Sequence, residues 1–160
     1  MVTEEKIWKL LEQVSDPEVP VLSIIDLGIV RKVEIQEDNT CIVTITPTYS
    51  GCPAMQYIEK EIGNILKEIT NVKVVTVLSP AWTTDWLSEE GRIKLKKYGI
   101  APPEHEIDKS VLFADPVVVP CPLCHSKNTR MVSQFGSTAC KAHYQCNDCL
   151  EPFDYFKCLK

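Results

Sequence analysis

Residues 41–69 read CIVTITPTYSGCPAMQYIEKEIGNILKEI, and they contain a strand pattern followed by a helix pattern. The β-branched run at residues 41–46 predicts a strand. Apolar residues then recur with the spacing of one helix face, and Pro53 suits a first helical turn, so we expect a helix over residues 53–69. Residues 47–52 form the junction between the two elements.

The flanking sequence completes a small α+β domain. Residues 29–35 form another β-branched run, and a turn-like segment separates them from residues 41–46, which predicts an antiparallel hairpin. A chain with this alternation packs its helices on one face of a short mixed sheet, so we expect a small α/β sandwich. In chain order the expected elements are a helix at 3–14, strands at 29–35 and 41–46, a helix at 53–69, a strand at 72–78 and a helix at 88–98.

The last part of the chain differs in its cysteine content. Six of the eight cysteines follow residue 120, and four of these form two Cys-x-x-Cys pairs: Cys121 with Cys124, and Cys146 with Cys149. Each pair turns two sulfurs toward one point, so two pairs supply the four soft ligands of a tetrahedral zinc site. With short strands at 129–134, 142–145 and 153–156, this predicts a zinc ribbon stabilised by its metal.

Other interpretations of these cysteines stay open. They could be reduced core cysteines or a disulfide framework, and a rubredoxin-like iron site has the same spacing. His125, His143, Cys140 and Cys158 exceed a four-thiolate shell. We expect the two histidines at the surface or beside the ligands, and the two cysteines packed as small hydrophobic residues.

Composition bounds the organisation and the class of protein. A proline-rich, charged stretch at 100–116 predicts a linker, so we expect a domain at 1–100, a linker at 101–116 and the ribbon at 117–160. A net charge of -5 and a pI near 5.2 argue against a nucleic-acid binder. Charges scattered through residues 1–20 predict neither a secretory signal nor a membrane span, so we expect a cytoplasmic protein with reduced thiols.

Cys52 is the candidate reactive residue of the first domain. It lies where a strand ends and a helix begins. Unpaired backbone N–H groups and the positive end of the helix dipole would favour its thiolate. The alternative is a cysteine that only fills this junction. Cys41, inside a strand pattern, is expected in the core.

Asp16 and Glu18 are candidate supporting residues. They flank Pro17 in a short loop, so their carboxylates are held close together. Such a pair can bind a cation or take part in acid–base chemistry. The alternative is that they cap the following turn. His105 stands alone in the linker.

Two resemblances to known families add to this. DPEVP at 16–20, IDLGIV at 25–30 and GCP at 51–53 resemble the iron–sulfur cluster assembly domain family, whose SufT-like members take part in maturing iron–sulfur proteins. TPTYSGCPA at 46–54 and the cysteine-rich tail from Phe135 to Cys158 are similar to the PaaD family, a component of the bacterial phenylacetyl-CoA epoxidase system. The second resemblance covers nearly the whole chain.

The resemblance implies an accessory role in phenylacetate breakdown, without catalytic activity of the chain's own. The implied task is assembly or delivery of iron or an iron–sulfur cluster to the oxygenase or its reductase, with Cys52 as a transient ligand and Asp16 and Glu18 beside it. PTYS at 47–50 departs from the more hydrophobic run of many family members. The alternatives are a stably bound structural subunit and an independent thiol enzyme using Cys52. A homo-oligomer stays open.

Overall fold

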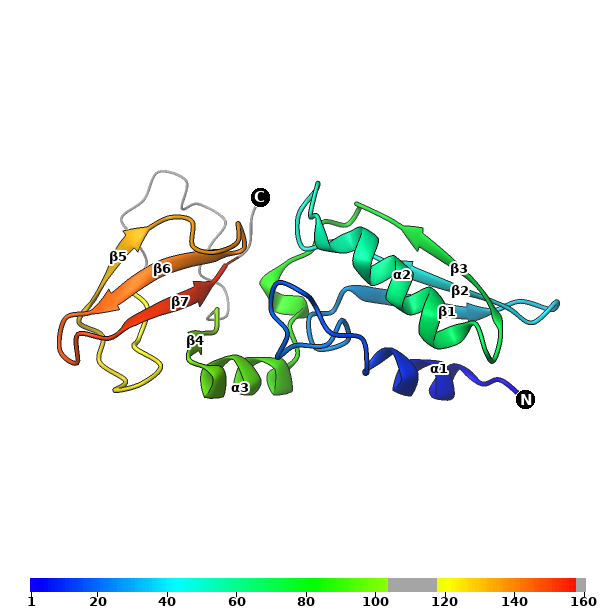
Figure 1. Ribbon diagram of the computed structural model, residues 1–160, viewed down its shortest axis with the longest axis horizontal. Helices are drawn as coiled ribbons and strands as arrows, with labels where there is room; N and C mark the ends of the chain where they lie inside the picture. The colour runs from blue at the N-terminus through cyan, green and yellow to red at the C-terminus, as the bar shows by residue number, and fades with distance from the viewer. Residues whose placement is uncertain (104–117, 158–160) are drawn as a thin grey trace. The chain divides into compact units, whose positions relative to one another are not determined.

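The computed structural model describes residues 1–103 and 118–157 (Figure 1). The chain divides into two compact units, Met1–Gly91 and Arg92–Lys160. This division falls inside helix α3 (Glu89–Tyr98) and not at the sequence-based boundary after residue 100. Most of the predicted linker, including His105, lies outside the described residues.

The first unit contains a three-stranded mixed sheet. Its strands are β1 (Val30–Ile35), β2 (Thr40–Ile45) and β3 (Asn71–Thr76), in the order β1-β2-β3. β1 and β2 form the predicted antiparallel hairpin, with Val33 opposite Val43. β3 runs parallel to β2 because helix α2 (Ala54–Leu66) provides the crossover between them. The predicted mixed sheet is confirmed.

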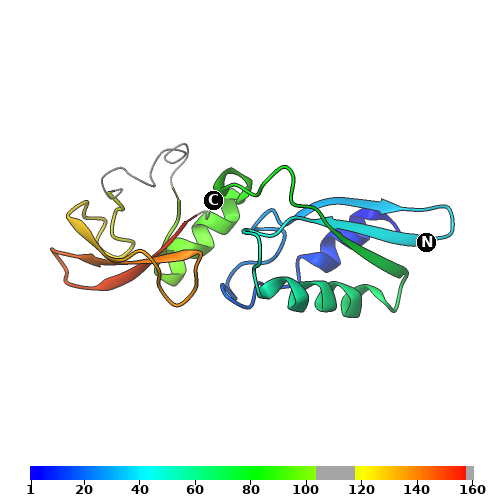
Figure 2. The same ribbon diagram turned by 90° about the horizontal axis from the view of Figure 1, so that it is seen from above.

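Two helices cover one face of this sheet (Figures 1 and 2). Along β2 the side chains of Cys41, Val43 and Ile45 are fully buried, whereas the residues between them are partly exposed. This alternation places the core on one face only. Fully buried residues of α1 (Glu4–Leu11) and α2 complete the core: Ile7, Leu11, Ile58, Ile62 and Leu66. Each contributes about 1.5–3 kcal/mol of burial free energy.

A second layer of contacts joins the loops at one end of the sheet. The indole N–H of Trp82 donates a hydrogen bond of 2.7 Å to the carbonyl of Leu27. Trp86, in the short 3-10 helix η1 (Thr84–Trp86), lies against Gly28 and stacks under the guanidinium of Arg31 at 3.5 Å. Gly28 has φ of 70°, and a Cβ there would lie 2.3 Å from the Trp86 carbonyl oxygen. Only glycine fits both restraints.

The second unit is built on a four-stranded sheet in the order β4-β7-β6-β5. β5 (Thr129–Ser133), β6 (Lys141–Cys146) and β7 (Pro152–Phe156) form the expected antiparallel ribbon. The sequence did not predict β4 (Ile100–Ala101), which pairs in parallel with β7. Its small core clusters residues from all these parts: Ala101, Val119, Cys121, Ala142, Tyr144, Cys146, Phe153 and Tyr155.

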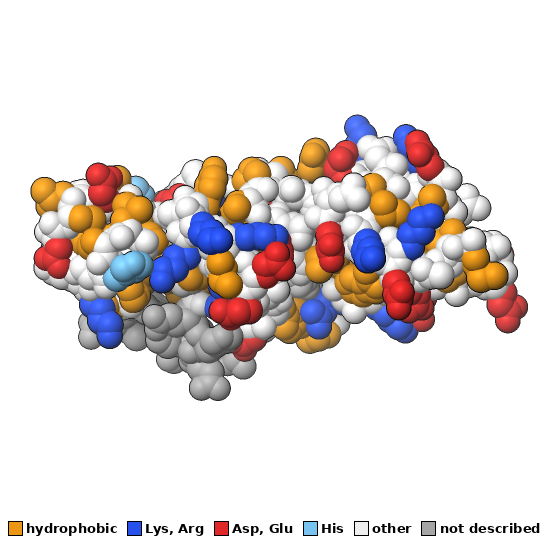
Figure 3. Space-filling view, turned by 90° about the horizontal axis from the view of Figure 1, so that it is seen from below, with side chains coloured by type: hydrophobic (Ala, Val, Ile, Leu, Met, Phe, Trp, Pro, Cys, Tyr) orange, Lys and Arg blue, Asp and Glu red, His pale blue; other side chains and the backbone are white. Residues whose placement is uncertain are grey.

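The surface carries mixed charge. Figure 3 shows acidic, basic and hydrophobic side chains interspersed over one face of the molecule. Within residues 1–103 and 118–157, none of the helices has the length and apolar character needed to cross a lipid bilayer.

Candidate functional site

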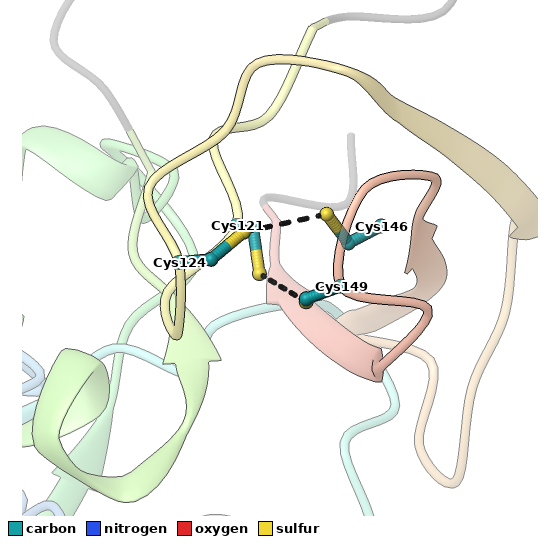
Figure 4. Close-up of side chains that lie close together, drawn as sticks. All are labelled: Cys121, Cys124, Cys146 and Cys149. Atoms are coloured by element: carbon teal, nitrogen blue, oxygen red, sulfur yellow. Dashed lines mark hydrogen bonds between the residues drawn. The ribbon is translucent and has the colours of Figure 1, made fainter.

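The strongest candidate site is formed by the two cysteine pairs of the second unit (Figure 4). Cys121 and Cys124 lie in a turn before β5, Cys146 ends β6, and Cys149 lies in the turn that leads to β7. The residue after each pair, His125 or Leu150, has φ of 64°. These left-handed residues reverse the chain, so each turn closes around its own sulfurs.

The four sulfur atoms have the spacing of a tetrahedral metal shell. The sulfurs of Cys121 and Cys149 are 3.8 Å apart, and those of Cys124 and Cys146 are 3.5 Å apart. All four lie within 4.8 Å of one another. A tetrahedron with Zn–S bonds of about 2.3 Å has edges of about 3.8 Å. The donor set and its dimensions therefore fit zinc.

The four thiols disturb one another's ionisation. The backbone N–H of Cys149, with that of Asp148, lowers the pKa of Cys146 to about 7. The N–H of Glu151 acts in the same direction on Cys149, but desolvation and the neighbouring sulfurs of Cys124, Cys146 and Cys121 raise the pKa of Cys149 to about 12. Four thiolates cannot coexist at this distance without a compensating cation, so the cluster is chemically suited to a divalent metal.

The surplus residues lie outside this cluster. The His143 ring nitrogen is 3.5 Å from an Asp154 carboxylate oxygen on the neighbouring strand. Cys140 is buried, and its sulfur lies 3.1 Å from the Thr138 hydroxyl. No disulfide joins any of the seven cysteines in the described part of the chain, so the disulfide interpretation is wrong for them. Cys158 lies outside the described residues.

The structure corrects the expected ionisation of Cys52. The side chain is buried, with 8% of the residue exposed. Burial raises the pKa of its thiol; the N–H of Ala54 opposes this, and the carboxylates of Glu18 and Asp16 raise the pKa further. The predicted preference for the thiolate at this helix start is therefore wrong, because desolvation and nearby negative charge outweigh the backbone N–H.

Asp16 and Glu18 come within electrostatic range of Cys52. Asp16 is buried, and its Oδ1 accepts hydrogen bonds from the backbone N–H groups of Glu18 at 2.7 Å and Val19 at 3.1 Å. The turn-capping alternative thus describes Asp16 well. Since this turn also holds both carboxylates near the thiol, the three candidate residues of the first unit belong to one region.

Sequence reasoning missed three buried polar residues near this region of the chain. Thr46 and Thr48 lie between β2 and Cys52, and the Thr46 hydroxyl has no hydrogen-bond partner among the described residues. Asp26 is also buried; its Oδ2 accepts from the N–H of Ser23 at 3.0 Å, and its backbone carbonyl accepts from the N–H of Ser88 at 2.8 Å. The signal was present, because all three lie within the quoted motifs.

Comparison with known proteins assigns each part of the chain. The family model described as the PaaD zinc beta ribbon domain matches residues 106–157, and the iron-sulfur cluster assembly protein model matches residues 4–79. The D component of the 1,2-phenylacetyl-CoA epoxidase of Escherichia coli K12 is 49% identical over 159 residues, which cover 96% of this chain and 92% of that protein.

Further relatives match the first unit. The "Fe-S protein maturation auxiliary factor YitW" of Bacillus subtilis 168 is 39% identical, over 58% of this chain and 92% of its own length. A solved structure of a conserved hypothetical protein from Thermotoga maritima is 31% identical, with a TM-score of 0.51, and the match covers 59% of this chain and 94% of that one. These relatives share the α+β fold of the first unit. The chain belongs to the PaaD family of phenylacetyl-CoA epoxidase components, in which an iron–sulfur assembly domain is followed by a zinc ribbon.

Proposed function

We propose that this protein is an accessory maturation factor of a phenylacetyl-CoA epoxidase system, which assists the supply of iron or an iron–sulfur cluster to the oxygenase or its reductase. The match over 96% of the chain to the D component of an epoxidase carries this proposal. The relatives of the first unit named as iron–sulfur maturation factors support the kind of task.

The first unit is proposed to hold its cargo transiently through Cys52, with Asp16 and Glu18 beside it. The buried thiol has a raised pKa, so a ferrous ion or a cluster must displace a proton to bind it. Carboxylate oxygens and one thiolate supply mixed ligands for iron. One sulfur alone gives an exchangeable hold on the cargo.

The second unit is proposed to hold a structural zinc ion through Cys121, Cys124, Cys146 and Cys149. Sulfur distances of 3.5 and 3.8 Å fit the tetrahedral shell, and four protein ligands leave no open position for chemistry. Iron in the same four-thiolate shell is the alternative. Metal analysis of protein purified without oxygen separates them: we expect one zinc per chain in this site, whereas iron there would refute the zinc assignment.

The maturation role is tested in cells that lack the native protein. Cys52→Ala is compared with Cys41→Ala, because both remove a buried cysteine from the first unit, with exposed fractions of 8% and 0%. We expect oxygenase or reductase isolated from Cys52→Ala cells to contain less iron and to be less active, whereas Cys41→Ala cells should resemble wild type. Full iron loading with Cys52→Ala would exclude the proposed role of Cys52.

The burial of Cys52 favours a second candidate, a structural subunit that remains bound to the epoxidase. This candidate requires stoichiometric co-purification with the oxygenase and activity that falls when the protein is removed after assembly. A fully assembled epoxidase that retains its rate without it would exclude this candidate. An independent thiol enzyme is disfavoured, because the acidic neighbours of Cys52 oppose formation of a nucleophilic thiolate.

A further inference from the structure

Outside the four sulfurs, a set of polar residues joins the two cysteine turns to each other. The Ser126 hydroxyl, after the first pair, hydrogen-bonds to Oδ2 of Asp148, inside the second pair. The Asn128 side-chain amide donates to Oδ1 of the same carboxylate at 2.9 Å. Both oxygens of Asp148 are therefore used on the opposite turn, although the side chain is at the surface.

Ser126 and Asp148 also contact the sulfurs through their backbones. The N–H of Ser126 hydrogen-bonds to the sulfur of Cys124, and the N–H of Asp148 hydrogen-bonds to the sulfur of Cys146. Each residue thus holds a ligand of its own turn through its backbone and the other turn through its side chain. Fixing the side-chain pair fixes the two N–H groups that orient these sulfurs.

Neighbouring hydrogen bonds hold this pair in place. The N–H of Asn128 donates to the Ser126 hydroxyl at 3.0 Å, and the Asn147 side chain donates to Oδ1 of Asn128 at 3.0 Å. The N–H of Asn147 donates to the carbonyl of Asn128 at 2.8 Å. The link between the turns is therefore a connected network whose members support one another.

We propose that Asp148 and Ser126 form a latch between the two cysteine turns that slows loss of the bound metal. This inference rests on the proposed metal site. Release of the ion requires the sulfurs of one turn to separate from those of the other, and the latch must open before they separate. Asp148 and Ser126 are positioning residues, since their side chains hold the ligands in place and do not bind the metal.

The test measures the rate at which a chromogenic chelator removes zinc from the full-length protein. Asp148→Ala should release zinc about tenfold faster, the size of effect typical for residues that orient metal ligands. Asp148→Asn keeps an acceptor for Asn128 and should fall between Asp148→Ala and wild type. Ser126→Ala keeps the N–H to Cys124 but loses the hydroxyl, so it should also accelerate release.

Glu151→Ala is the matched control. Glu151 is acidic, its N–H also acts on a ligand sulfur, and its side chain makes no hydrogen bond among the described residues. This variant should stay within about twofold of wild type, as expected for an exposed charge. The double variant of Ser126 and Asp148 should release zinc no faster than the faster single variant, because both remove the same link.

Three outcomes separate the claims. An unchanged release rate in Asp148→Ala would overturn the latch, and so would fully additive effects in the double variant. Equal acceleration by Glu151→Ala would show a general charge effect and also overturn it. Absence of zinc from the purified wild-type protein would instead refute the zinc site on which the latch depends, before any rate is compared.

Discussion

Removing the metal should unfold the second unit and leave the first unit intact. The core of the second unit contains only three large aromatic side chains, Tyr144, Phe153 and Tyr155, beside small residues. The first unit has a separate core of aliphatic residues from α1, α2 and the sheet. We therefore expect chelation under reducing conditions to abolish the packing of one unit alone.

The expected size of the effect follows from these two cores. The three aromatic side chains contribute about 5–9 kcal/mol of burial free energy before the entropic cost of ordering the chain is subtracted. A structural zinc ion contributes about 10–16 kcal/mol of apparent binding free energy. Because a whole domain is stable by only about 5–15 kcal/mol, loss of the ion exceeds what the second unit can tolerate.

The two units can be observed separately. All three tryptophans, Trp8, Trp82 and Trp86, lie in the first unit, so their fluorescence should not change on chelation. Amide NMR signals from β5, β6 and β7 should lose their dispersion. Cys146→Ala should reproduce this loss without chelator, whereas Cys140→Ala, which removes a buried cysteine outside the cluster, should retain zinc. Dispersed signals from metal-free protein would refute the reasoning.

Three further predictions concern the first unit. Because burial raises the pKa of Cys52, iodoacetamide should modify it more slowly at pH 8 in native than in unfolded protein, as measured by mass spectrometry; equal rates would contradict its burial. The same shift stabilises the fold below the ordinary thiol pKa, and this contribution is lost as pH rises toward the native pKa, so urea unfolding should show stability falling above about pH 8.5, and by less in Cys52→Ala. Gly28→Ala should lower the unfolding free energy by more than about 2 kcal/mol, since its Cβ would meet Trp86 at 2.3 Å, whereas Gly51→Ala, with φ of 81° and open space, should cost about 1–2 kcal/mol; similar losses would show that the close contact is unimportant.

Local patterns were enough to predict most of the fold. Thr3 accepts a hydrogen bond from the N–H of Lys6 as a helix cap, and Gly99 has φ of 87° where the last helix of the first 100 residues was expected to close. The spacing of the two cysteine pairs predicted one cluster, because each pair is a local turn and the antiparallel strands bring the turns together. These features depend on residues close in sequence.

What the sequence did not predict depends on residues far apart in the chain. β4 has two residues and exists because it pairs with β7, more than 50 positions later. The packing of Trp86 on Gly28 joins two loops with no shared motif. The burial of Cys52 likewise follows from tertiary packing, whereas the helix-dipole argument considered only its neighbours. A dipole contributes little once the group is desolvated near two carboxylates.

The contrast between Cys52 and the cysteine cluster bears on the proposed division of work. A metal held by four thiolates in two linked turns leaves only when several bonds break together, which suits permanent binding. A buried, protonated thiol beside carboxylates must lose a proton to bind iron and regains it on release, so acid favours transfer and its affinity is modest. A carrier needs such an exchangeable site, and a stabilising site must not be exchangeable. The raised pKa that contradicts a nucleophilic Cys52 is therefore compatible with a Cys52 that carries cargo.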